Sequence, residues 1–127
     1  TTLFRSETEA ELICGQKITD IDSVTKAANL IKAKGVKNVI ITMGSKGAFV
    51  CTDTICELVP SYKVKAVDTT GAGDIFNGAL VLAISEGRDW IEATRFACKT
   101  SAIAVTRVGA QSSAPYRNEV DVFNPEK

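Results

Sequence analysis

The first third of the chain carries apolar residues at helical spacing and then a continuous apolar run. This pattern predicts a helix over Glu7–Cys14 that ends at Gly15, and a longer helix over residues 22–34. The apolar face of the longer helix consists of Val24, Ala27, Ala28 and Ile31. Residues 39–41 are continuously apolar and β-branched, which predicts a buried strand. A strand of this kind after helices is typical of a parallel sheet covered on both faces, so the predicted fold class is α/β.

The rest of the chain alternates short β-like runs with two longer helical patterns. Strands are predicted at residues 55–59 and 62–67, separated by Pro60 and Ser61, and residues 48–51 would be a strand in the hairpin alternative for the loop before them. Helices are predicted over residues 74–86 and from Asp89 to about Thr106. Gly87 separates these two helices, and Asp89 is the expected N-cap of the second.

Composition excludes several classes of function. The chain is 45% apolar, carries 15 acidic and 15 basic residues, and has no long apolar run. These features favour a soluble globular domain without membrane or nucleic-acid partners. We interpret the short group Lys32, Lys34 and Lys37 as a solvated helix end. Four cysteines and no histidine exclude mixed Cys/His zinc sites and favour free buried thiols.

Residues 68–74, with the sequence Asp-Thr-Thr-Gly-Ala-Gly-Asp, form the most informative stretch of the chain. Small residues before a helix allow successive backbone N–H groups to point at one anion, which the helix start also attracts. Asp74 is placed to take a proton from a substrate hydroxyl. The stretch therefore predicts a phosphoryl-transfer site, although a helix cap preceded by a simple turn is an alternative. It fits neither a Walker A motif nor a dinucleotide fingerprint.

A second small-residue loop follows the predicted strand at residues 39–41. Its residues are Thr42, Met43, Gly44, Ser45, Lys46 and Gly47. The end of such a strand is where α/β sheets bind ligands, and Lys46 would reach a phosphate as a point charge. A glycine-rich hairpin with a solvent-facing lysine is the alternative.

The sequence at 68–80, D-T-T-G-A-G-D-x-F-x-G-A-L, resembles the C-terminal signature of the PfkB carbohydrate kinases. Residues 8–11, 41–47 and 102–111 resemble segments of the ribokinase branch, in the same order and spacing. The resemblance implies a ribokinase-like three-layer α/β/α sandwich, of which this chain supplies the C-terminal nucleotide-binding part. It also implies ATP-dependent phosphorylation of D-ribose to D-ribose 5-phosphate. Another PfkB sugar or nucleoside kinase, or a non-catalytic nucleotide-binding half-protein, are the alternatives.

The same resemblance implies roles for individual residues. Asp74 would be the base and contact the substrate, and the amides of Gly71, Ala72, Gly73 and Asp74 would form the anion hole. ATP would contact Ser6, the 42–47 loop, Gly73, Asp74 and Cys98. Mg²⁺ would be ordered through Glu9, although Ser6 and Glu9 also fit a helix capping box. K⁺ would lie among Asp68, Thr70, Ala104, Arg107, Gly109 and Ser113.

The resemblance also bears on where the chain comes from. The family's sugar-binding half and lid have no counterpart here, so we expect residues 7–127 to be the C-terminal part of a longer kinase. Residues 1–6 resemble the translation of a cloning adapter, and Ser6 stands where the family has Asn. The complete protein is expected to be a homodimer. The resemblance and the thiols imply a cytoplasmic location, with the nucleus as a second option.

Overall fold

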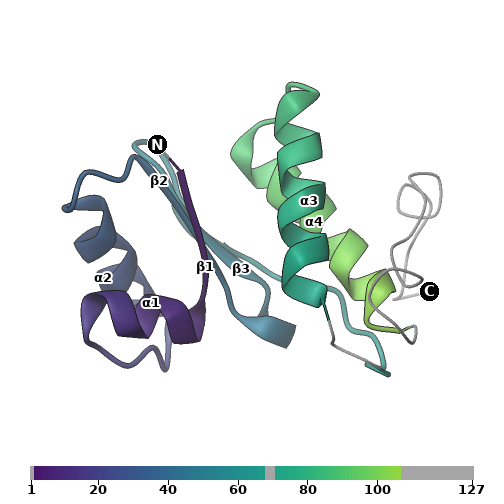
Figure 1. The fold of residues 1–127 in the computed structure, drawn as a ribbon, viewed down its shortest axis with the longest axis horizontal. Coiled ribbons are helices and arrows are strands. Elements are labelled where there is room, and N and C mark those ends of the chain that lie inside the picture. The colour runs from purple at the N-terminus through teal and green to yellow at the C-terminus, as the bar shows by residue number, and fades with distance from the viewer. Residues whose placement is uncertain (1, 68–70, 107–127) are drawn as a thin grey trace. The chain divides into compact units, whose positions relative to one another are not determined.

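The computed structural model describes residues 2–67 and 71–106. The chain divides into two compact units, Thr1–Val59 and Pro60–Lys127. We describe each unit by itself. Figure 1 shows the strands together with α1 and α2 in the first unit, and α3 and α4 in the second.

The two helices of the first unit have complete caps. Helix α1 spans Glu7–Cys14, as predicted, and Gly15 ends it in the left-handed conformation at φ 72°. Helix α2 spans Ile21–Lys32, so it begins and ends slightly earlier than predicted. It begins there because the Asp20 carboxylate accepts the Ser23 N–H at 2.8 Å, which caps the first turn.

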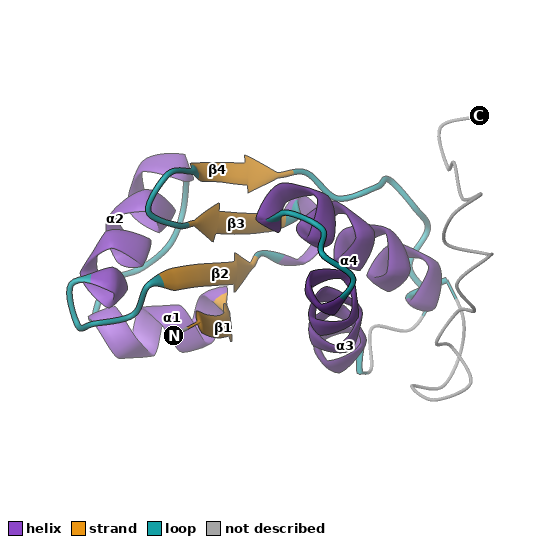
Figure 2. Ribbon diagram, turned by 90° about the horizontal axis from the view of Figure 1, so that it is seen from above, coloured by secondary structure: helices purple, strands orange, loops and turns teal. Residues whose placement is uncertain are grey.

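The first unit contains a four-stranded sheet in the order β1-β2-β3-β4. The strands are Thr2–Ser6, Asn38–Thr42, Ala48–Cys51 and Cys56–Val59. Strands β1 and β2 are parallel, whereas β2–β3 and β3–β4 are antiparallel. Figure 2 shows the arrow of β3 running against those of β2 and β4. The expected parallel sheet is therefore correct only for the first pair. Helices α1 and α2 supply the crossover that parallel strands need, while short turns impose hairpins on the rest.

Strand β1 is an element that the sequence pattern did not predict. Its residues pair with β2 from Thr2↔Asn38 to Ser6↔Thr42. These are the residues for which we expected an adapter origin. That origin stays a prediction, but the residues have a structural role in the sheet.

Helices α1 and α2 cover one face of the sheet (Figure 1). Alternate strand residues Val39, Ile41 and Phe49 are buried against them, within a core that includes Ala10, Val24, Ala27, Ala28 and Ile31. The predicted apolar face of α2 is thus confirmed. Fully burying side chains of this size contributes about 1.5–3 kcal/mol each, so this cluster is the main source of stability in the unit.

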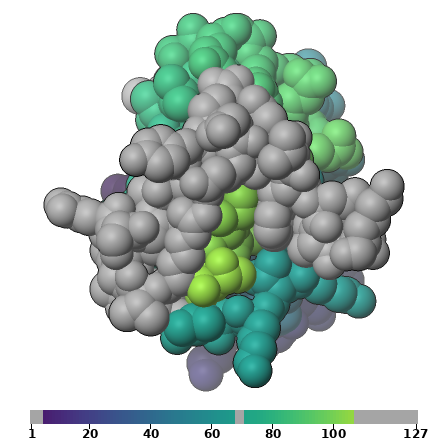
Figure 3. Space-filling model, turned by 90° about the vertical axis from the view of Figure 1, so that its right-hand side faces the viewer, coloured from purple at the N-terminus to yellow at the C-terminus, as the bar shows by residue number. Residues whose placement is uncertain are grey.

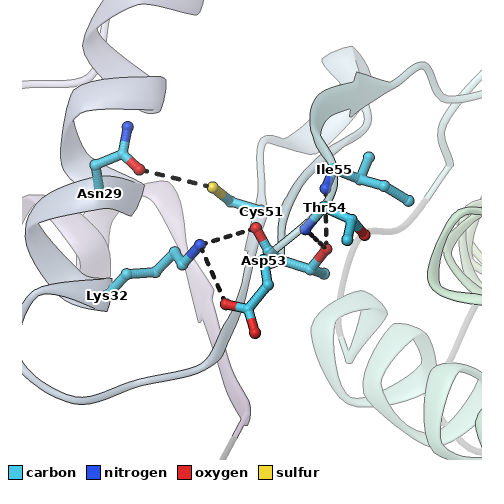
Figure 4. Close-up of polar contacts among 7 residues, drawn as sticks. Asn29, Lys32, Cys51, Asp53, Thr54 and Ile55 are labelled. Carbon is cyan, nitrogen blue, oxygen red and sulfur yellow. Dashed lines mark hydrogen bonds and ion pairs between the residues drawn. The ribbon is translucent and has the colours of Figure 1, made fainter.

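Lys32 was wrongly assigned to a solvated helix end. Its ammonium group donates to the Thr52 carbonyl oxygen at 2.8 Å and lies 3.9 Å from the Asp53 carboxylate. Figure 4 shows the side chain extended from α2 toward the turn that joins β3 and β4. The partners lie 20 residues further along the chain, so local charge pattern gave no sign of them.

The second unit is a helical hairpin preceded by an irregular segment. Residues 62–67 are not a strand, contrary to prediction, and in the described chain Val67 donates its N–H to the Val105 carbonyl at 2.6 Å. A β-like sequence does not form a strand unless a neighbouring strand pairs with it. Helix α3 spans Ala72–Ser85 and α4 spans Trp90–Ala104, with Asp89 accepting the Glu92 N–H at 2.8 Å, as the N-cap prediction required.

Helices α3 and α4 pack against each other and bury small and aromatic side chains. The short connection makes them antiparallel, so the start of α3 and the end of α4 lie at the same end of the hairpin (Figure 1). Buried residues in the hairpin include Phe76, Leu80, Ala93 and Ala97. Val81 and Leu82 of α3 are exposed. The helix therefore presents apolar surface on a second side.

Candidate active site

The start of α3 lacks the side-chain cap that the other α-helices of the described chain have. Gly71 is the N-cap residue, lies in the left-handed region at φ 74°, and makes no side-chain cap hydrogen bond. The first intrahelical bond runs from the Ile75 N–H to the Gly71 carbonyl at 3.0 Å. The N–H groups of Ala72, Gly73 and Asp74 therefore have no acceptor within the helix.

The geometry of this helix start suits an anion. Three N–H groups without an acceptor in the helix and the positive end of the helix dipole favour a negatively charged oxygen at the same place. The carboxylate of Asp74 belongs to the first turn and is exposed. The helix begins at Ala72, two residues before the predicted start, so the predicted amides belong to the helix itself. Residues 68–70, with Asp68 and Thr70, lie outside the described residues.

The second predicted loop forms a compact turn at the carboxyl end of β2. Residues Gly44–Lys46 form a 3-10 helix. The Met43 N–H donates a hydrogen bond to the Gly47 carbonyl at 2.8 Å. Gly44 and Gly47 have φ values of 58° and 113°, which explains the requirement for glycine at both positions. Ser45 and Lys46 are exposed. The turn thus has the hairpin form that was the alternative for this loop, and its nucleotide role stays a prediction.

Pairing of β1 with β2 places Ser6 directly beside Thr42. Both residues stand at the carboxyl ends of parallel strands, the edge where α/β sheets usually bind ligands. Both residues were predicted to bind the nucleotide, but their adjacency was not predicted. A strand followed directly by a helix cap is the sequence feature that could have indicated it, and this feature is informative only once the pairing of β1 with β2 is known.

Ser6 and Glu9 form the capping box of α1. The Ser6 hydroxyl accepts the Glu9 N–H at 3.2 Å, and the Glu9 carboxylate accepts the Ser6 N–H at 3.1 Å. The backbone hydrogen bond from Ser6, followed by the one from its hydroxyl, lowers the pKa of Glu9 below 4.5. The capping box that was the alternative role for this pair is therefore observed. The Glu9 side chain accepts the capping hydrogen bond and still remains exposed to solvent.

Two further predicted residues lie on α4. Cys98 is buried, and burial raises the pKa of its thiol to about 12, so it is a neutral packing group in this chain. Ala104 is the last residue of α4, where carbonyl oxygens lack helical donors. Figure 3 shows the yellow-green end of α4 beside the teal segment that carries Val67.

The predicted site residues therefore fall into two groups, one in each unit. Ser6, Glu9 and the 42–47 turn belong to the first, while the 71–74 helix start, Cys98 and Ala104 belong to the second. Arg107, Gly109 and Ser113 lie outside the described residues. Within residues 2–67 and 71–106, no three His, Cys, Asp or Glu side chains gather as a metal site would require. The helices in this same part of the chain are too short or too polar to cross a membrane.

Comparison with known proteins decides the family. The model of the pfkB family carbohydrate kinases matches residues 1–117. The chain belongs to this family. A ribokinase from Haemophilus influenzae is 45% identical over 118 residues, covering 93% of this chain and 39% of that protein. This pfkB-family chain thus spans about two fifths of the length of the curated relative.

Solved structures agree with the fold class. A ribokinase from Thermotoga maritima matches with a TM-score of 0.88 and 45% identity, over 96% of this chain and 41% of that one. A ribokinase from Arabidopsis thaliana, complexed with ribose and ATP, matches with a TM-score of 0.87 and 31% identity, over 97% of this chain and 41% of that one. The predicted ribokinase-like α/β fold is confirmed.

Proposed function

We propose that the complete protein containing this sequence transfers the terminal phosphoryl group of ATP to the primary hydroxyl of D-ribose, giving D-ribose 5-phosphate. Membership of the pfkB family and 45% identity to a ribokinase support this proposal. The observation that carries it is the start of α3, where Gly71 leaves the first amides uncapped beside an exposed Asp74.

Each part of that helix start has a role in the proposed reaction. Asp74 is exposed in the first turn of α3 and accepts the proton of the attacking ribose hydroxyl as the general base. The amides of Gly71, Ala72, Gly73 and Asp74 stabilise negative charge on the transferring phosphoryl group. In phosphoryl transfer, positioning and electrostatic stabilisation supply most of the rate enhancement.

The 42–47 turn and Ser6 are proposed to bind the nucleotide. They lie together at the carboxyl edge of β1 and β2, and the turn exposes Ser45 and Lys46. A hydroxyl and an ammonium group are suitable partners for phosphate oxygens. Cys98 is buried in this chain, so its proposed role is limited to a packing contact with the adenine base of ATP.

Two metal ions complete the proposal. Glu9 would order the water ligands of Mg²⁺, and its exposed carboxylate has the oxygen chemistry that this ion requires. K⁺ would lie among Asp68, Thr70, Ala104, Arg107, Gly109 and Ser113, of which Ala104 offers a helix-terminal carbonyl. When bound, the ions neutralise phosphate charge.

Substitution of Asp74 tests the proposed base. In the complete protein, Asp74→Asn should lower turnover by about 100-fold or more and leave ATP affinity nearly unchanged, because the amide cannot accept the proton. Asp89→Asn is the matched control, since it changes an N-cap aspartate of the same unit and asparagine caps equally well. Near-normal turnover in Asp74→Asn would refute the assignment.

The choice of sugar needs a separate experiment, because this chain spans only 39% of its curated relative. Initial rates of the complete protein with D-ribose, 2-deoxyribose, fructose and adenosine should rank D-ribose first by kcat/KM. A different best substrate would keep the kinase assignment and change its acceptor. ATP binding without phosphorylation of any acceptor would favour a non-catalytic nucleotide-binding protein.

A further inference from the structure

Cys51 and Cys56 face each other across the hairpin formed by β3 and β4. They are direct partners in the antiparallel register, separated by a turn of four residues. The Thr52 N–H donates to the Ile55 carbonyl at 2.6 Å, the ladder bond that lies next to a non-hydrogen-bonded pair, while the Ile55 N–H donates to the Thr52 hydroxyl at 3.1 Å. Pairs alternate along an antiparallel ladder, which makes Cys51 and Cys56 a non-hydrogen-bonded pair with Cα atoms about 4.5 Å apart. That separation lies within the range of about 4.4–6.8 Å that a disulfide spans.

The two thiols differ in exposure. Cys51 is fully buried on the α2 side of the sheet, where its thiol donates a weak hydrogen bond to the Asn29 amide oxygen at 4.0 Å (Figure 4). Cys56 is exposed on the edge strand β4. Side chains of directly opposed residues point to the same face, so the two thiols lie on the same side of the hairpin. The pair therefore joins one accessible thiol to one protected thiol.

Lys32 holds this end of the hairpin against α2. Its ammonium group donates to the Thr52 carbonyl at 2.8 Å and lies 3.9 Å from the Asp53 carboxylate. Both contacts are made by residues of the turn between the cysteines. Lys32 therefore holds this turn next to the position where a disulfide between Cys51 and Cys56 would form.

We propose that Cys51 and Cys56 form a redox-active dithiol that exchanges with small-molecule disulfides such as glutathione disulfide. The Cys56 thiolate attacks one sulfur of glutathione disulfide, forms a mixed disulfide, and releases one glutathione thiolate. The Cys51 thiolate then attacks the Cys56 sulfur and releases the second. Two protein thiols are oxidised to one disulfide, one glutathione disulfide is reduced to two thiols, and the two protons pass to the released thiolates.

The electrostatics of Cys56 set the pace of this exchange. Cys56 is exposed as a residue, but partial burial of its thiol is the largest cause that raises its pKa, to about 12; the neighbouring Cys51 thiol adds to the rise, while Lys32 opposes it. Below that value the thiolate fraction, and with it the exchange rate, increases about tenfold for each unit of pH. Lys32 of α2 and Cys51 of β3 are the titratable groups that act on Cys56.

Peptide mapping of the full 127-residue chain tests the proposal. The chain is equilibrated with about 0.1 mM glutathione disulfide, quenched with acid, alkylated in denaturant and digested with trypsin. Cleavage after Lys46 and Lys63 gives peptide 47–63, which carries both cysteines and should be unalkylated and lighter by two hydrogen atoms. Endoproteinase cleavage before Asp53 should leave its halves joined. Cys14 and Cys98 lie in other tryptic peptides and serve as internal controls.

Single substitutions separate the two steps. Cys51→Ser should trap glutathione on Cys56. In the unsubstituted chain the Cys51–Cys56 disulfide should exceed the glutathione adduct about tenfold, because the neighbouring Cys51 thiol has an effective concentration on the order of mM. Cys14→Ser should change neither product. A stable glutathione adduct on Cys56 with Cys51 still alkylated, or a disulfide that links either residue to Cys14, would overturn the proposal. The measurement on the unsubstituted chain decides this even where a variant does not fold.

Discussion

Helices α1 and α3 begin in opposite ways. At α1, Ser6 and Glu9 satisfy each other's backbone donors, with hydrogen bonds of 3.1 and 3.2 Å. At α3, Gly71 supplies no side chain, and the amides of the first turn have no partner within the helix. The same partial positive charge exists at both ends. Among the described residues, a side chain caps the start of α1 but not the start of α3.

The difference shows how a functional helix start is distinguished from a structural one. Glycine in place of serine at an N-cap costs only a few tenths of a kcal/mol, so an uncapped start is inexpensive to maintain. The glycine also supplies the φ of 74° that the turn requires. We therefore infer that Gly71 serves the ligand-binding geometry, whereas Ser6 caps α1 in addition to its proposed contact with the nucleotide.

The largest effect on this comparison is expected from Gly71→Ala. Alanine at φ 74° costs about 1–2 kcal/mol, which lowers the free energy of unfolding. In the complete protein the displaced amides should also lower turnover by about tenfold or more. Denaturant unfolding and steady-state kinetics measure the two effects.

Gly73→Ala is the matched control for that substitution. Gly73 does not have a positive φ, and an added Cβ would have no heavy atom within 4 Å. Alanine is favoured over glycine in a helix by up to about 1 kcal/mol, so stability should stay the same or rise. Equal losses of stability in both variants would contradict the role assigned to the backbone of Gly71.

Sequence was sufficient wherever the determining contact is local. Helix α1 was predicted with its observed bounds, because a capping serine precedes it and a left-handed glycine ends it within the same few residues. The Asp89 cap was local for the same reason, whereas the hairpin at 44–46 was only the alternative for its loop. The helix after the 68–74 motif was likewise predicted, although it starts at Ala72, and the ligand roles of its first residues stay predictions.

Features that depend on distant partners were missed or wrong. Strand β1 exists because β2 pairs with it from 36 positions away, and the adjacency of Ser6 and Thr42 follows from that pairing. The strand expected at residues 62–67 has no pairing strand within the described chain. Lys32 finds its partner 20 residues away. Local pattern contains no information about which segments meet.

A smaller effect is expected from Ser6→Ala at the capped helix start. Loss of the hydroxyl removes one half of the capping box and should lower the free energy of unfolding by about 1 kcal/mol. Ser6→Asn is the control, because asparagine caps as well as serine and is the residue that the family resemblance led us to expect. A fall in ATP affinity with Ser6→Ala, at unchanged stability, would mean that Ser6 serves the nucleotide and not the helix.

The smallest effect concerns the charge of Glu9. Its pKa is lowered below 4.5, first by the Ser6 N–H and then by the Ser6 hydroxyl. A carboxyl whose folded pKa is depressed contributes stability that is present above its unfolded pKa and is lost as the pH falls through the folded value. Unfolding measured from pH 6 down to pH 3 should therefore show this loss in the parent protein and not in Glu9→Gln, which keeps the hydrogen bonds of a capping box. Glu7→Gln removes a charge from the same turn without touching the box, and it should leave the loss in place. Identical pH profiles for the parent and Glu9→Gln would show that the carboxylate is not engaged by the helix in solution, which would leave it free for the proposed Mg²⁺ role.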